Sequence, residues 1–114
     1  IRIIDFGGAF ENVGALVVQK DGKIVVSGSA GPDPNAGDFA AARLLPNGSL
    51  DATFGTGGRT LIDFNGDSEL ATGVAIGKGN RIVLVGNAGS RAVVLQLTPA
   101  GQLDATFGNG GRVL

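Results

Sequence analysis

The feature that most constrains the fold of this 114-residue chain is an internal repeat. Residues 50–59 recur as residues 103–112, and the two segments differ only where Thr56 becomes Asn109. Similar matches join residues 4–8 to 62–66, 23–28 to 81–86 and 44–48 to 97–101. Repeats of a few tens of residues are typical of folds in which one unit is stacked or arranged radially, because a single unit cannot bury its apolar face alone.

The two copies differ in length at one point. The early matches lie 58 residues apart and the late ones 53, so the first copy holds a five-residue insertion. We therefore expect three segments in the chain. They are a first repeat or blade at 1–58 with an insertion loop at 31–38, a second repeat or blade at 59–111, and the start of a third repeat at 112–114, either for closure or from truncation.

Each copy predicts four short strands, because apolar and β-branched runs of four to six residues alternate with Gly, Pro, Asn and Asp. We expect the strands at 2–5, 14–18, 23–28 and 39–45, and again at 59–63, 73–76, 81–86 and 92–98. Gly and Asn favour hairpin turns at 20–22 and 78–80, where a positive φ is needed. The Leu-Asp-Ala-Thr-Phe segments predict one helical turn each, with Asp51 or Asp104 as the N-cap.

A four-stranded antiparallel sheet is the blade of a β-propeller. We therefore predict an all-β fold of β-propeller-type repeats, with two four-stranded antiparallel blades in the chain. A β-sandwich or a stacked solenoid stays open as an alternative, because strands of this length and spacing suit those folds too. Two blades cannot close a ring, and the chain starts and stops in the same part of the repeat. We expect it to associate with itself as a homo-oligomer, or to join neighbouring repeats of a longer chain.

The order of elements in each copy also indicates a family. An apolar strand, a Gly turn, a second apolar strand ending in Gly, a Pro-x-Gly turn and Leu-Asp-x-x-Phe-Gly-x-x-Gly follow one another twice. This pattern resembles the delta-60 repeat of bacterial proteins over essentially the whole chain. The second hairpin departs from it, with Gly79-Asn80-Arg81 in place of Asp21-Gly22-Lys23. The resemblance implies a β-propeller from a surface or secreted bacterial protein, and it carries over no catalytic residue.

Composition excludes several kinds of site. The chain has no Cys, His, Met, Trp or Tyr, which excludes disulfides, thiolate and imidazole metal ligands, and Ser-His or Cys-His catalysis. Nine Lys plus Arg stand against ten Asp plus Glu and are scattered, so we expect no nucleic-acid partner. No run of about 18 apolar residues is present, so we expect no membrane insertion. We expect no enzyme, no cofactor and no metal, but a structural or interaction module outside the cell or on its surface.

The insertion is the feature that the repeat does not explain. It carries three oxygen donors, Asp33, Asn35 and Asp38, and the aromatic Phe39 follows directly. Loops at the edge of a rigid scaffold are common places for binding, so these four residues are the candidate contact with a partner or ligand. The favoured interpretation beside it is an inert insertion that the fold tolerates. A small-ligand or glycan-binding propeller remains the alternative function, with Phe10 and Phe39 as its non-repeated aromatics. A hydrolase or lyase propeller is the less favoured one, because the chain has no His.

Several residues recur at equivalent places in both copies, and each has a structural interpretation beside a chemical one. The acidic ones could hold a cation or transfer protons, but their position beside Phe and Gly favours the capping of turns. The phenylalanines are expected to anchor one repeat on the next. The arginines after Gly-Gly could bind an anion, although pairing with a neighbouring blade is the favoured interpretation. These residues are Asp5 and Asp63, Glu11 and Glu69, Asp51 and Asp104, Phe54 and Phe107, and Arg59 and Arg112.

Overall fold

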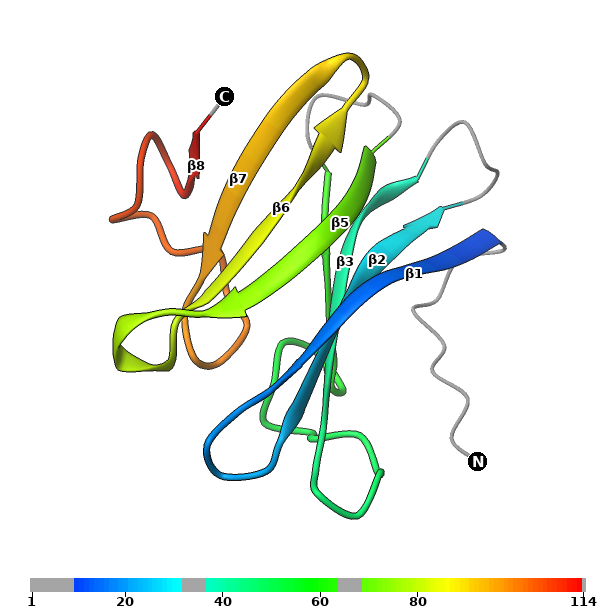
Figure 1. Ribbon diagram of the computed structural model, residues 1–114, viewed down its shortest axis with the longest axis vertical. Coiled ribbons are helices and arrows are strands. Elements are labelled where there is room, and N and C mark those ends of the chain that lie inside the picture. The colour runs from blue at the N-terminus through cyan, green and yellow to red at the C-terminus, as the bar shows by residue number, and fades with distance from the viewer. Residues whose placement is uncertain (1–9, 32–36, 64–68, 114) are drawn as a thin grey trace.

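The structure, a computed structural model, describes residues 10–31, 37–63 and 69–113. It consists of two four-stranded antiparallel sheets, which we call the first and second blades (Figure 1). The first blade contains, in spatial order, β1 (Phe10–Val18), β2 (Ile24–Gly31), β3 (Asp38–Leu44) and β4 (Arg59–Ile62). The second contains β5 (Glu69–Ile76), β6 (Ile82–Ala88), β7 (Arg91–Leu97) and β8 (Arg112–Val113), with the short 3-10 turn η1 (Lys78–Asn80) between β5 and β6. Within the described ranges, no helix is long and apolar enough to cross a membrane.

The strands are joined differently from the prediction at one place. Residues 59–62, predicted to open the second blade, form β4, the fourth strand of the first blade, where Arg59 pairs with Ala42 and Ile62 with Phe39. The sequence repeats at residue 58, but the sheets do not divide there. Each blade instead takes its last strand from the start of the next repeat, and residues 112–113 supply β8 to the second blade in the same way. The predicted strand at 2–5 lies outside the described residues.

The first strand of each blade carries the same irregularity. The pairing of β1 with β2 shifts between Val13 and Ala15, and the pairing of β5 with β6 shifts between Ala71 and Gly73. The extra residue is Gly14 in one blade and Thr72 in the other. A bulge of this kind bends a strand and increases its twist. It also lets β1 and β5 begin four residues before the predicted strands, at Phe10 and Glu69.

The two blades share one hydrophobic core, and β5 is the strand of the second blade that lies against β1 and β2 (Figure 1). Directly paired residues of antiparallel strands point to the same side, so the register assigns each side chain to a face. The first blade contributes what we call its joint face: Val17, Val25, Phe39, Ala41, Phe54 and Ile62. The joint face of the second blade consists of Val74, Ile76, Ile82, Leu84, Val93, Leu95 and Leu97. Burial of one large apolar side chain contributes about 1.5–3 kcal/mol, so this joint is a major source of stability.

The Leu-Asp-Ala-Thr-Phe segment forms a capped turn. The Asp51 carbonyl accepts the N–H of Phe54 at 3.0 Å, and its Oδ1 accepts the N–H of Thr53 at 3.0 Å and the Thr53 hydroxyl at 2.6 Å. The predicted cap is therefore confirmed. The predicted single turn ends where the chain turns away at Gly55, whose φ is 52°.

Candidate functional site

The closest polar contacts between the blades surround the turn at residues 99–101. The Gly55 N–H donates to the Ala100 carbonyl at 2.7 Å, and the Thr60 hydroxyl donates to the Gly101 carbonyl at 2.7 Å. Gly101 has a φ of 86°, and a Cβ added there would lie 2.8 Å from Cε1 of Phe54. Only a glycine therefore allows the turn of one blade to sit this close to the ring of the other.

Arg43 adds a charged side chain to this contact between the blades. It is 6% exposed, and its Nη1 donates to the carbonyl of Pro99 at 2.6 Å while its Nε donates to Oδ2 of Asp51 at 2.9 Å. The centre of its guanidinium lies 4.8 Å from the centroid of the Phe54 ring. One buried side chain thus joins an acid and an aromatic of its own blade to the backbone of the next.

The Asp51 carboxylate is the negative charge that pairs with Arg43. Hydrogen bonds from the Thr53 side chain and backbone, then from Arg43 and Lys23, hold its pKa well below the usual range, although burial opposes them. The Lys23 ammonium lies 3.3 Å from Oδ2. The carboxylate is therefore ionised at neutral pH and carries out the capping role expected of it.

The second blade repeats the arrangement with different partners. Hydrogen bonds from Thr106 and Gln96 lower the pKa of Asp104, and Arg81 also donates to it, with Nε 3.1 Å from Oδ2. Gln96 occupies the position of Arg43. Its Nε2 donates to Asp104 at 2.9 Å, and its side chain ends in a neutral amide where Arg43 has a charged guanidinium. Of these two equivalent positions, that of the first blade alone is an arginine.

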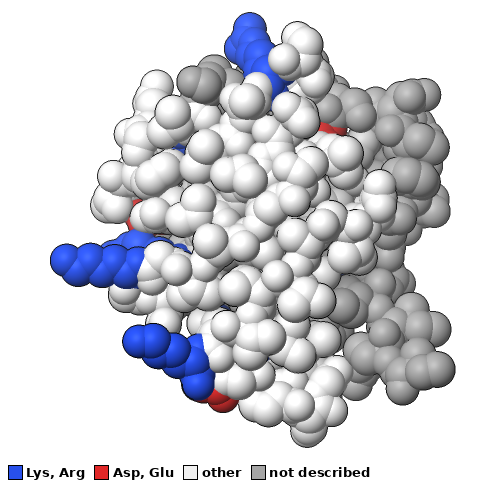
Figure 2. All heavy atoms as spheres, in the orientation of Figure 1, with Lys and Arg blue, Asp and Glu red and all other residues white. Residues whose placement is uncertain are grey.

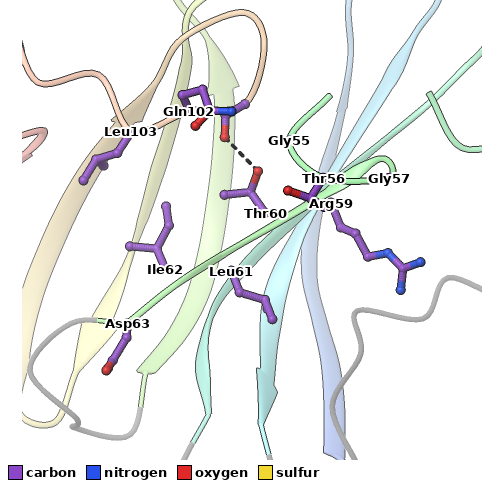
Figure 3. Close-up of a pocket in the computed structure, with 11 residues that line it drawn as sticks. Gly55, Thr56, Gly57, Arg59, Thr60, Leu61, Ile62, Asp63, Gln102 and Leu103 are labelled. Atoms are coloured by element: carbon purple, nitrogen blue, oxygen red, sulfur yellow. Dashed lines mark hydrogen bonds between the residues drawn. The ribbon is translucent and has the colours of Figure 1, made fainter. Parts of the chain in front are cut away.

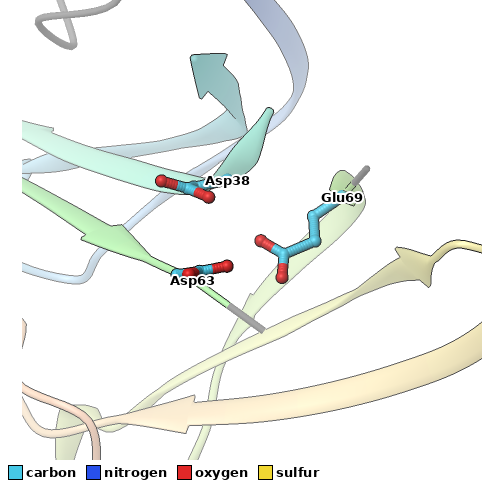
Figure 4. A group of neighbouring side chains, drawn as sticks. All are labelled: Asp38, Asp63 and Glu69. Carbon is cyan, nitrogen blue, oxygen red and sulfur yellow. The ribbon is translucent and has the colours of Figure 1, made fainter. Parts of the chain in front are cut away.

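A cluster of three carboxylates lies at the opposite end of the joint (Figure 4). Asp38 begins β3, Asp63 follows β4 and Glu69 begins β5, and one oxygen of each lies within 4.8 Å of the others. Glu69 is 2% exposed, and its Oε2 accepts the N–H of Phe39 at 3.2 Å. Burial raises the pKa of Asp38, and the charge of Asp63 raises it further. Carboxylate oxygens suit hard cations such as Ca²⁺, and the same geometry lets Glu69 cap the start of a neighbouring strand.

With this geometry in place, the comparison with known families is decisive. Residues 19–54 and 80–107, equivalent parts of the two repeats, match the family described as a domain of unknown function, DUF5122, a β-propeller. The chain belongs to the DUF5122 β-propeller family. The predicted β-propeller-type blades are thereby confirmed, in preference to a sandwich or a solenoid. No curated protein and no solved structure matches the chain.

The residues predicted for a binding loop are only partly brought together in this DUF5122 chain. Asp33 and Asn35 lie outside the described residues, and Asp38 belongs to the carboxylate cluster. Phe39 is 1% exposed and pairs with Ile62 within the core, so its ring is not presented to a ligand. The expectation of a surface role for Phe39 is corrected, because β3 begins at Asp38 and turns the next side chain toward the second blade.

The sequence did not predict that these three carboxylates lie together. Asp63 and Glu69 were noted as repeated acids and Asp38 as part of the insertion, so nothing joined them. The signal that could have joined them is positional: each one stands at the end of a predicted strand or beside it. Their counterparts Asp5 and Glu11 lie where the structure describes no side chain.

An open groove of about 810 Å³ follows β4 along the outside of the joint (Figure 3). Gly55 and Leu61 lie on one side and Gln102 and Leu103 on the other. Arg59 also lines it, but in Figure 3 its guanidinium extends away from Gln102 and Leu103. The groove of the DUF5122 propeller is thus the seam between its blades, with one cation and one carboxylate, Asp63, in its described lining.

Lysine and arginine side chains are few on the face of the chain that Figure 2 shows. On the face that Figure 2 shows, the lysine and arginine side chains stand apart at the rim. The middle of that face is formed by uncharged side chains. Nucleic-acid binding needs a continuous basic stripe or patch, and the described part of this face does not provide one.

Proposed function

We propose that this DUF5122 propeller is a non-enzymatic structural and interaction module, of the delta-60 type, in a secreted or cell-surface bacterial protein. The doubled Leu-Asp-Ala-Thr-Phe-Gly-x-Gly-Gly motif supports the delta-60 relationship, and that relationship supports the location. In this proposal its role is to be one part of a larger ring of blades, built with equivalent blades from other copies or from neighbouring repeats.

One observation carries the proposal: each blade has a second face, which we call its open face, that carries exposed apolar side chains, although Val26, Ala40 and Ala42 on that face of the first blade are buried. On the open face of the first blade these are Val13, Leu16, Val18 and Leu61, which are 47–63% exposed. On the open face of the second they are Leu70, Val85 and Val113, which are 39–45% exposed. These seven are the exposed large hydrophobic residues of the described chain, and each of them lies on one of the two open faces.

The repeat explains what these open faces are. Val13, Leu16 and Val18 correspond to Ala71, Val74 and Ile76, which are buried or half-buried where the second blade packs on the first. The open face of the first blade is thus the same surface that the second blade uses in the joint. Apolar faces of this kind mark a contact with another subunit or another repeat, because leaving them in water favours aggregation.

Light scattering coupled to size exclusion tests the proposal on the 114-residue chain over a range of concentrations. Assembly predicts discrete multiples of the 11.3 kDa chain mass, such as three or four copies for six or eight blades. A mass of one chain at every concentration would overturn self-assembly. Indefinite aggregation would show that the apolar open faces associate but do not close a ring.

A further inference from the structure

The joint, which is the contact between the two blades inside the chain, serves here as a template. Each of its two sides has an equivalent elsewhere in the chain because the sequence repeats. Phe54 and Gly55 of the first blade hold the turn at 99–101 of the second, and Phe54 is 0% exposed there. Their equivalents in the second blade are Phe107 and Gly108, and Phe107 is only half-buried. The equivalent of the held turn is residues 46–48, where Pro46 and Asn47 are exposed. The phenylalanine, the glycine and the turn that meet in the joint are therefore present again at the two outer sides of the molecule.

The open face of the second blade differs from the template at several residues, among them Ala92 for Phe39 and Val113 for Thr60, and two further differences bear directly on docking. Gln96 stands where Arg43 reaches the Pro99 carbonyl, as described above. Thr72 stands at the bulge where the first blade has Gly14, and a Cβ at Gly14 would overlap the carbonyl of Ala71. Thr72 is exposed on β5, and its hydroxyl donates to the Val85 carbonyl at 3.4 Å.

We infer that the open face of the second blade receives the first blade of a second copy, head to tail, and that Thr72 and Gln96 make this joint weaker than the one inside the chain. The inference rests on the proposed assembly and assigns its contact surface. In it, Phe107 and Gly108 receive the turn at 46–48 of the second copy. A head-to-tail contact of this kind uses two different surfaces and closes into a ring when the rotation allows.

The two differences act at separate points of the joint. Glutamine cannot donate a charge-assisted bond to the Pro46 carbonyl of the second copy, so that carbonyl keeps water instead. The Thr72 side chain occupies the space into which β1 of the second copy would enter, and so holds the inner strands apart. Both effects weaken docking and leave the fold of each copy unchanged.

The first experiment restores these two residues of the template. The double variant Thr72→Gly, Gln96→Arg is compared with the unmodified chain by sedimentation velocity, with Ser90→Arg as the control. Ser90 is an exposed residue of the turn before β7, so it adds the same charge away from both open faces. We expect the double variant to associate at least about tenfold more tightly and the control to leave association unchanged.

The second experiment tests the head-to-tail geometry. Leu16→Glu blocks the open face of the first blade and Val85→Glu that of the second; both side chains are already exposed, at 63% and 40%. We expect each variant alone to stay monomeric and an equimolar mixture to form a one-to-one dimer through the two unblocked faces. Ser90→Glu is the matched control and should assemble like the unmodified chain. Circular dichroism verifies that each variant is folded, and Val18→Glu replaces Leu16→Glu if it is not.

The outcomes separate the two proposals. If neither the chain nor the double variant associates at any concentration, the assembly proposed above fails and the inference fails with it. If the chain associates but the double variant and the blocked variants behave as it does, assembly stands and this contact surface is wrong. If Val85→Glu still associates alone, the first blades meet each other and the head-to-tail arrangement is wrong.

Discussion

The guanidinium of Arg43 donates a hydrogen bond to the carbonyl of Pro99, 56 residues further along the chain, at 2.6 Å. The same group is bound to Asp51 within its own blade. Arg43 thus makes the position of the second blade depend on the internal turn of the first, and this dependence can be measured.

Replacing Arg43 with Gln gives the first blade the side chain that the second has at Gln96. The variant keeps a donor for Asp51 but loses the charged bond to Pro99, so we expect it to lower the free energy of unfolding by about 2 kcal/mol. Urea denaturation measures this difference. Arg91→Gln, which removes an exposed arginine at the start of β7, is the control and should change stability by no more than about 0.5 kcal/mol. Equal effects of the two variants would mean that the Pro99 contact contributes nothing.

Gly48 and Gly101 provide a matched pair for the joint. Their φ values are 92° and 86°, so alanine strains the backbone equally at both, by roughly 1 kcal/mol. A Cβ at Gly48 has no other atom within 4 Å, whereas at Gly101 it meets Phe54 and the Gly55 nitrogen at 2.8 and 2.9 Å. We expect Gly101→Ala to lower the free energy of unfolding by about 1–3 kcal/mol more than Gly48→Ala, measured by urea denaturation at a protein concentration at which the chain is monomeric. Equal losses of unfolding free energy in the two variants would show that Phe54 does not pack closely against residue 101.

Acid should weaken the protein through its capping aspartates. The pKa of Asp51 is lower in the folded chain than the ordinary value of 3.8, so its stabilisation is complete above that value and is lost as the pH falls below it. We expect the urea midpoint to drop between pH 7 and pH 3. Asp51→Asn should unfold more easily at pH 7 and lose less on acidification. A variant whose midpoint falls as steeply as that of the unmodified chain would assign the acid sensitivity elsewhere, with Asp104 as the next residue to test.

Asp38 predicts the opposite pH dependence. Its pKa is raised by burial and by Asp63, so the folded chain disfavours its charge, and stability falls as the pH rises from below 3.8 through the raised value. We expect Asp38→Asn to be more stable than the unmodified chain at pH 7 and equal to it at pH 3. The measurement is the melting temperature at the two pH values in the presence of a chelator. Destabilisation at pH 7 would show that the charge of Asp38 has a favourable partner.

The sequence predicted the strands well because the signal for them is local. Apolar runs between glycines and prolines mark β2, β3, β6 and β7 to within three residues, and the Asp51 cap follows from the side chain alone. The pairing of Arg59 with Ala42 was not predicted, since it depends on which sheet has a free edge and not on any property of residues 59–62.

The same limit applies to the site. Asp38, Asp63 and Glu69 were each noted from the sequence, but their meeting depends on how the second blade sits on the first. The direction of Phe39 depends on where β3 begins, and a shift of one residue would have placed its ring on the other face. Contacts between repeats are therefore what the sequence alone left undetermined.

The boundaries of the sheets are offset from those of the sequence repeats, and this offset affects how a protein built of such repeats can gain or lose them in evolution. The last strand of each blade comes from the repeat that follows in the sequence, so every repeat contributes strands to two successive blades. A recombination event that duplicates or deletes one repeat, wherever in the unit it breaks, adds or removes one whole blade and leaves every remaining sheet with four strands. The number of blades can thus vary by single genetic steps, while the shared strands keep neighbouring blades attached.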